Sequence, residues 1–308
     1  MKIAVFGTGG VGGYFGGRLA QAGAQVHLIA RGEHLESLRN GGLRVHSVRG
    51  DFEVSPPATD NPEAIGPCDI VLFTVKSFHT RSAASRLKPL IGRDTAIVSL
   101  QNGVDNEEII SSVVGASHVM GGIAYIFAEI VGPGVIAHTG GPASLQFGEM
   151  EGTRSERAKL LLDQCANAGI GAEISDDIRA GLWSKFAFIC AVAGMTSAIR
   201  LPLGEIRAIP DSWEMFRRLL EEVVAVAAAE GVHLPGDLLS RHVSFAESLE
   251  PNSYSSLHFD MTHGRAMEVE ALHGTVVRLG RKHGVPVPMA EAVHAVLKPW
   301  AVRNKTPD

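Results

Sequence analysis

The sequence predicts a Rossmann-type α/β domain followed by an all-α domain. A glycine-rich turn near the N-terminus lies between a short apolar run and a helical segment. Short, β-branched apolar runs recur through the first half of the chain, and long helical runs replace them after Ser175. We therefore expect the Rossmann domain over residues 1–175 and the helical domain over residues 176–308.

The composition is that of an ordinary soluble globular protein. The 308 residues are 45% hydrophobic and 20% charged, and this length suits two domains. A formal net charge of −5 leaves no basic surface of the kind that nucleic-acid-binding proteins carry. The three cysteines are far apart and odd in number, which favours a reducing cytoplasm over a disulfide framework.

The sequence carries no signal for a membrane segment or a metal site. No uninterrupted apolar stretch reaches the roughly 18–20 residues of a membrane helix. Glycines interrupt the N-terminal apolar run, so a signal peptide is not expected. The 13 histidines form no ligand-like cluster such as HExxH. We expect a cytoplasmic protein with no metal, no membrane partner and no nucleic-acid partner.

The glycine-rich turn predicts a dinucleotide site. The run "KIAVF" before it is typical of a buried parallel strand, and a helical stretch after it leads to a second strand, "AQVHLIA". Glycines in a GxGxxG turn allow close approach of a pyrophosphate, which the helix N-terminus attracts. The predicted binding residues are Gly7, Thr8, Gly9, Gly10, Val11 and Gly12.

The residue that closes the second strand indicates which dinucleotide is bound. NAD-binding sites usually place an acidic side chain there, which accepts a hydrogen bond from the ribose 2′-hydroxyl. This chain has Arg31, whose guanidinium can pair with a 2′-phosphate through two charge-assisted hydrogen bonds. Arg31 therefore favours NADP(H), and an ordinary exposed surface arginine is the alternative.

Two further strands end in polar residues. "CDIVLFTVKS" has Lys76 near its end, and "DTAIVSLQNGV" ends in Gln101-Asn102-Gly103. Ligands of doubly wound sheets bind outside the carboxyl ends of the strands, so Lys76 and Asn102 are candidate cofactor contacts. A solvated Lys76 and a plain Asn-Gly turn are the alternatives.

Periodicity and turn residues outline the other elements. "LRVHSVRGDFEVSP" predicts a hairpin that turns at residues 49–51, and residues 131–149 predict short strands separated by glycine turns. A helix at 153–168 and the strand "GAEIS" follow. The second half predicts helices at about 176–200, 211–231, 235–247, 255–284 and 288–298. The apolar face of "RRLLEEVVAVAAAEGV" fits internal packing or a homodimer interface.

Lys185 is an isolated charge at the head of the apolar run "SKFAFICAVAGMTSAIR". The next cation along the chain is Arg200. Lys185 either carries its hydrocarbon stem to the surface or is an acid directed into a cleft.

Taken together, the motifs resemble the ketopantoate reductase (2-dehydropantoate 2-reductase) family over nearly the whole chain. The matching segments are "GTGGVGG", Arg31, "FTVKS", "LQNGV", "PGVIAHTG", "LWSKF" and "SSLHFDMTHGRAMEVEALHGTVVRLGRKHGVPVP". The last is the most specific, because its serine pair, Asp260, Glu268 and the glycine of "LHG" fall at the family spacing.

The resemblance implies NADPH-dependent reduction of a 2-keto acid to the 2-hydroxy acid, and a place in pantothenate biosynthesis. It implies that the glycine turn and Arg31 bind NADPH, and that Lys76 and Asn102 lie beside the nicotinamide and its ribose. Lys185 would be the general acid in a dry crevice between the two domains. Glu268 would orient Lys185 and contact the cofactor ribose, and Ser256 would bind the substrate carboxylate.

One departure from the family concerns the substrate. The family's lysine helix commonly carries asparagines one and two turns after the lysine, where this chain has Ile189 and Ala193. Each missing hydrogen bond is worth about 0.5–1.5 kcal/mol, or about 1.5–3 when one partner is charged. The substrate is therefore either 2-dehydropantoate, held by other groups, or a more apolar 2-keto acid.

Two other functions remain open on the sequence. An opine-type or 3-hydroxyacid dehydrogenase also joins a Rossmann domain to a helical one. A non-catalytic NADP-binding sensor would need the glycine turn and Arg31, but it would not need Lys185, Glu268 and Ser256.

Overall fold

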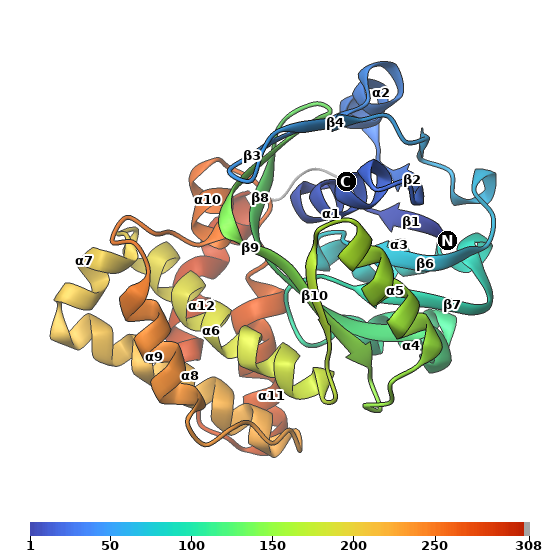
Figure 1. Ribbon diagram of the computed structural model, residues 1–308. Coiled ribbons are helices and arrows are strands. Elements are labelled where there is room, and N and C mark those ends of the chain that lie inside the picture. Colours follow the sequence, from blue (N-terminus) through green and yellow to red (C-terminus); the bar gives the residue numbers. More distant parts are fainter. Residues whose placement is uncertain (305–308) are drawn as a thin grey trace. The chain divides into compact units, whose positions relative to one another are not determined.

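A computed structural model describes residues 1–304 (Figure 1). The chain forms two compact units: one comprises Met1–Gln101 and Asn106–Ile178, and the other comprises Asn102–Asp105 and the chain from Arg179 onward. The first unit contains a parallel-rich sheet with helices, and the second unit is helical. The predicted fold class is confirmed.

Six parallel strands form the Rossmann part of the sheet, in the order β5-β2-β1-β6-β7-β8. From the central β1 the chain first builds outward through β2 to β5 on one side, and later through β6 to β8 on the other. A dinucleotide fold places its ligand at this reversal of strand order. The strands span Lys2–Phe6 (β1), Gln25–Ile29 (β2), Ala58–Thr59 (β5), Cys68–Phe73 (β6), Ile91–Ser99 (β7) and Val119–Gly132 (β8).

The sheet continues beyond β8 through an antiparallel partner. β9 (Val135–Glu149) pairs with β8, β3 (Leu43–Ser47) pairs with β9, and β10 (Gly171–Ile174) also pairs with β9. β4 (Phe52–Val54) pairs antiparallel with β3, which confirms the predicted hairpin. The prediction of several short strands over 131–149 was wrong. β9 stays continuous because its pairing register with β8 shifts near its glycines, so that these residues irregularly pair with β8 but do not end the strand.

Side chains of β1 alternate between two cores, as expected for a strand buried on both faces. Ile3 and Val5 pack in the core that contains residues of α1 and α5, whereas Ala4 and Phe6 pack in the core that contains residues of α3 and α4. The helices of this unit are α1 (Gly10–Gln21), α2 (Gly32–Gly41), α3 (Thr80–Ala84), α4 (Asn106–Val114) and α5 (Glu156–Asn167), with short 3₁₀ turns at Pro62–Ala64, Ser77–His79, Lys88–Leu90 and Ala116–His118.

The long apolar helix α6 (Ile178–Ile199) contributes many residues to the core of the second unit. Its length and mean hydropathy of 1.5 would allow it to cross a membrane, but 61% of that window is buried inside the protein. This burial is typical of the core helix of a globular protein. The other helices are α7 (Leu203–Ala208), α8 (Pro210–Ala229), α9 (Leu238–Ser248), α10 (Ser256–Thr262), α11 (Thr275–His283) and α12 (Pro288–Arg303).

The predicted single helix over 255–284 was wrong. α10 ends at Thr262, and Gly264 then adopts a left-handed φ of +66°, which takes the chain out of the helical direction. A non-helical stretch that includes Glu268 follows, and then a π-helical turn, Glu270–Gly274, which joins α11. Glu268 therefore lies at a break between helices. The short helix α7 was not predicted.

Candidate active site

The glycine turn between β1 and α1 is packed so closely that side chains are excluded. Gly7 has a left-handed φ of +105°. A Cβ on Gly10 would lie 2.1 Å from the carbonyl oxygen of Ala128, and one on Gly12 would lie 2.5 Å from that of Gly7. The Thr8 hydroxyl donates to the carbonyl of Ile29 at 3.1 Å, which fixes the turn to the end of β2.

The start of α1 fits the phosphates of a dinucleotide. A Cβ on Gly9 would meet no atom within 4 Å, so this glycine faces open space. Within the described chain, no side chain caps Gly9 and no acidic residue lies in the first turn of α1. The N–H groups of a helix start attract anions, and here neither a capping side chain nor a carboxylate competes with a ligand for them.

Arg31 lies at the end of β2, immediately before α2. Its side chain is exposed and its backbone is extended, and Gly32 after it adopts a left-handed φ of +58°. The guanidinium therefore lies on the surface at the carboxyl end of β2. The glycine turn is hydrogen-bonded to this same strand end, through Thr8.

The loop that carries Lys76 is held by buried and partly buried side-chain hydrogen bonds. The Thr74 hydroxyl donates to the carbonyl of Gly7 at 2.6 Å. The Gln101 amide donates to the carbonyl of Val75 and to the Thr80 hydroxyl, both at 2.8 Å, and Thr80 also bonds Asn106 at 2.9 Å. Lys76 itself is exposed. Sequence reasoning missed Gln101 and Thr80, although the position of Gln101 beside Asn102 at a strand end was a usable signal.

Asn102 begins a short segment that belongs to the helical unit. In this segment the carboxylate of Asp105 accepts a hydrogen bond from the Thr275 hydroxyl at 2.9 Å and pairs with Arg278. Val104 packs against the core of the same unit. Asn102 thus belongs to the same unit as Lys185. The sequence did not indicate this.

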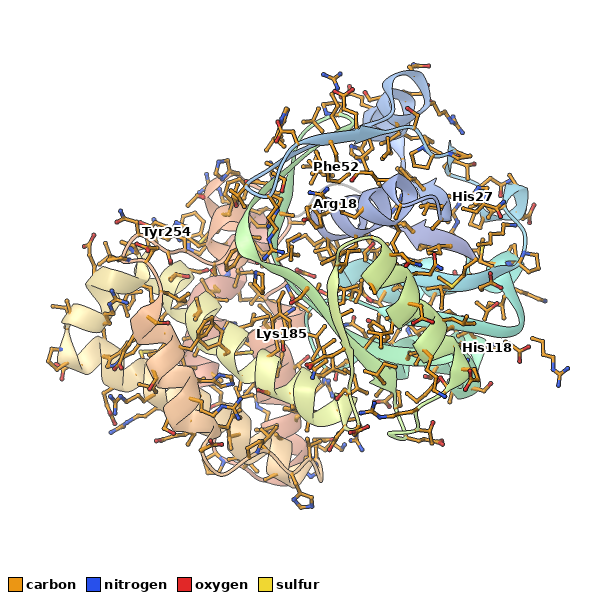
Figure 2. All side chains as sticks on the ribbon, viewed as in Figure 1. Arg18, His27, Phe52, His118, Lys185 and Tyr254 are labelled. Atoms are coloured by element: carbon orange, nitrogen blue, oxygen red, sulfur yellow. The ribbon has the colours of Figure 1, made fainter. Side chains whose placement is uncertain are left out.

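Lys185 lies in the first half of α6 (Figure 2) and is half-buried. Burial lowers the pKa of Lys185 from its ordinary 10.5 to about 8, and the carboxylate of Glu268 opposes this fall. Only 9% of Glu268 is exposed. A half-buried ammonium and a buried carboxylate therefore interact within this unit. Such an ammonium releases its proton near neutral pH, as a general acid must.

The residues one and two turns after Lys185 continue its side of α6 without polar groups. Ile189 is half-buried, whereas Ala193 is 1% exposed and belongs to the core. Thr196 follows on this side and bonds the Ser255 hydroxyl at 2.8 Å. Of the two residues that replace the expected asparagines, Ile189 is the one with accessible surface.

Ser255 and Ser256 have different positions. The Ser255 hydroxyl accepts a hydrogen bond from the backbone N–H of His258 at 3.1 Å and so caps α10. Ser256 is the first residue of α10, and its side chain is exposed. Its hydroxyl is thus available at a helix start, which also attracts a carboxylate.

The described residues 1–304 contain no group of three or more His, Cys, Asp or Glu side chains that could hold a metal ion.

Comparison with known proteins covers both units. The profile described as ketopantoate reductase PanE/ApbA matches residues 3–152, and the profile of its C-terminal domain matches residues 177–301. A Bacillus subtilis protein named uncharacterized oxidoreductase YkpB is 32% identical over 97% of this chain and 98% of its own. The 2-dehydropantoate 2-reductase of Mesorhizobium japonicum is 32% identical over 99% of both chains.

A solved structure shows the same relation. The PanE/ApbA family ketopantoate reductase of Ralstonia eutropha superposes with a TM-score of 0.91 at 35% identity, over 99% of this chain and 100% of that one. The matches extend from the glycine turn to α12. The chain is a member of the ketopantoate reductase family, a family of nicotinamide-dependent reductases that act on 2-keto acids.

Proposed function

We propose that this protein reduces a 2-keto acid to the 2-hydroxy acid with NADPH and with Lys185 as the proton donor. One observation carries the proposal: Lys185, whose pKa burial lowers to about 8, interacts with the buried carboxylate of Glu268 on an otherwise apolar helix. A solvated surface lysine would have neither property. The family membership supports the reaction class, and the residues given below support the cofactor and the roles.

The cofactor residues are those of the glycine turn and of the neighbouring strand ends. Gly7, Thr8, Gly9, Gly10, Val11 and Gly12 would bind the pyrophosphate through backbone N–H groups at the start of α1. Arg31 would pair with the 2′-phosphate that distinguishes NADPH from NADH. Lys76 and Asn102 would contact the nicotinamide and its ribose, and Glu268 would also reach the ribose.

The proton step follows from the electrostatics of Lys185. Bound NADPH supplies the hydride that adds to the keto carbon, which leaves negative charge on the oxygen. Lys185 donates a proton to that oxygen and becomes a neutral amine, which takes up a proton from solvent before the next turnover. Burial makes the ammonium a stronger acid, and the carboxylate of Glu268 keeps it protonated until the oxygen gains charge.

The substrate would be held by its carboxylate and by an apolar surface. Ser256 would donate its hydroxyl to the carboxylate at the start of α10. The half-buried Ile189, one turn after Lys185, would contact the rest of the substrate with its hydrocarbon side chain, whereas Ala193 belongs to the core. These residues favour a 2-keto acid with a more apolar chain than that of 2-dehydropantoate.

Replacing Lys185 tests the proton donor. Lys185→Ala should lower kcat about 10²- to 10⁴-fold, the usual contribution of a general acid. An exposed lysine of the same unit, Lys282, is the matched control, and Lys282→Ala should leave kcat unchanged.

In the unmodified protein kcat for reduction should fall as the pH rises through about 8, because Lys185 then loses its proton. Glu268→Gln removes the charge that raises this pKa, so the fall should move to lower pH. Full activity of Lys185→Ala would rule out the proposed role.

Replacing Arg31 tests the cofactor preference. Arg31→Ala should raise KM for NADPH about 10- to 100-fold, because charge-assisted hydrogen bonds worth about 1.5–3 kcal/mol are lost. KM for NADH should not change, because NADH has no 2′-phosphate. Arg39→Ala, at an exposed arginine within α2, should change neither value. If Arg31→Ala affects both cofactors equally or not at all, Arg31 does not bind the 2′-phosphate.

A panel of 2-keto acids tests the substrate class. With NADPH, kcat/KM should be higher for branched or aromatic 2-keto acids than for 2-dehydropantoate. Ile189→Asn should shift the ratio toward 2-dehydropantoate by roughly 2- to 10-fold, the worth of one hydrogen bond. An unmodified protein that prefers 2-dehydropantoate by orders of magnitude would exclude the apolar substrate and leave the reaction class intact.

A further inference from the structure

His273 is a fully buried histidine in the π-helical turn Glu270–Gly274. Its Nε2 lies 2.9 Å from the carbonyl oxygen of Cys190, which belongs to α6. A carbonyl can only accept, so Nε2 carries the proton and donates it. The imidazole thus links the π-turn to the helix that contains Lys185.

The main chain of α6 leaves room for this ring at Gly194. A Cβ on Gly194 would lie 2.6 Å from Nε2 of His273, closer than any side chain tolerates. Glycine inside a helix costs about 1 kcal/mol relative to alanine. Gly194 lies one helical turn after Cys190. The cost of this glycine is offset because it lets the His273 ring approach α6 and bind the Cys190 carbonyl.

The imidazole is held in its neutral form. Burial lowers the pKa of His273 to about 4, and the electrostatic effect of His294 on α12 acts in the same direction. Its Nδ1 finds no protein partner among residues 1–304. A buried acceptor without a partner costs about 1–3 kcal/mol, which a leucine in this place would avoid. The hydrogen bond to Cys190 therefore serves something besides packing.

Glu268 lies two residues before the π-turn, separated from it by Val269. The carbonyl of Glu268 accepts a hydrogen bond from Leu272 at 3.1 Å, and that of Val269 accepts one from Gly274 at 3.0 Å. The backbone of Glu268 is thus hydrogen-bonded to the turn that His273 attaches to α6. π-Helical turns are rare and are frequent at functional sites.

We propose that His273 is a positioning residue that fixes the Glu268 carboxylate relative to the Lys185 ammonium. The proposal rests on the proposed proton transfer. Two charges interact with an energy that falls with distance, so the acidity of Lys185 depends on where Glu268 is held. The hydrogen bond from His273 in the π-turn to Cys190 in α6, and the space that Gly194 leaves in α6, together set the position of Glu268.

The test compares His273→Leu, which removes the donor, with His273→Gln, whose amide can still donate to the Cys190 carbonyl. His273→Leu should lower kcat at least 10-fold and move its alkaline fall at least half a unit to lower pH. His273→Gln should restore most of both. Gly194→Ala displaces the His273 ring, so it should lower kcat and shift the pH profile as His273→Leu does. If His273→Leu does not fold, Gly194→Ala tests the positioning role in its place.

A matched control is His258→Leu. His258 also binds a main-chain carbonyl of α6, that of Thr196 at 2.9 Å, but it lies on α10 and not in the turn of Glu268. The pH at which kcat falls should stay where it is in this variant. If His273→Leu and Gly194→Ala keep the unmodified kcat and pH profile while Lys185→Ala is inactive, His273 does not position Glu268. If Lys185→Ala is itself fully active, the proposed function fails instead.

Discussion

The proposed chemistry depends on the balance between the burial of Lys185 and the charge of Glu268. Burial in an apolar helix alone would drive the amine toward its neutral form, in which it cannot donate a proton. The carboxylate alone, in water, would hold the ammonium too firmly. With both present the pKa is about 8, where the group is charged at neutral pH and still acidic. In the proposed function, the apolar character of α6 thus matters for the proton transfer as well as for the core.

In the proposed function, the sheet-containing unit binds the cofactor and the helical unit carries out the proton transfer. A parallel sheet whose order reverses at β1 brings a tight glycine turn and two strand ends to one edge, as binding of an extended dinucleotide requires. Hydrogen bonds from Thr74, Gln101 and Thr80 hold the Lys76 loop. In the proposed function, the helical unit supplies the proton donor and its carboxylate. The segment that begins at Asn102 belongs to this unit as well.

Local patterns in the sequence were enough to predict the Rossmann part and to single out Lys185. The β1–α1–β2 segment has its own strand, turn and helix signals, and Lys185 is conspicuous because its neighbours are apolar. The break before Glu268 was missed because residues 255–284 keep a helical pattern through Gly264, and one left-handed glycine outweighs that pattern. His273 could not be found, because its partner Cys190 is 83 residues away. Only the fold brings the two together.

The most direct measurement is the pKa of the Lys185 amine itself, followed by NMR of protein labelled with ¹⁵N-lysine, with Lys185→Ala to assign the signal. The account predicts a titration near pH 8 in the unmodified protein and a lower midpoint in Glu268→Gln, because the carboxylate is gone. A Lys185 amine that titrates near 10.5, as a solvated lysine does, and that ignores the loss of Glu268 would contradict it.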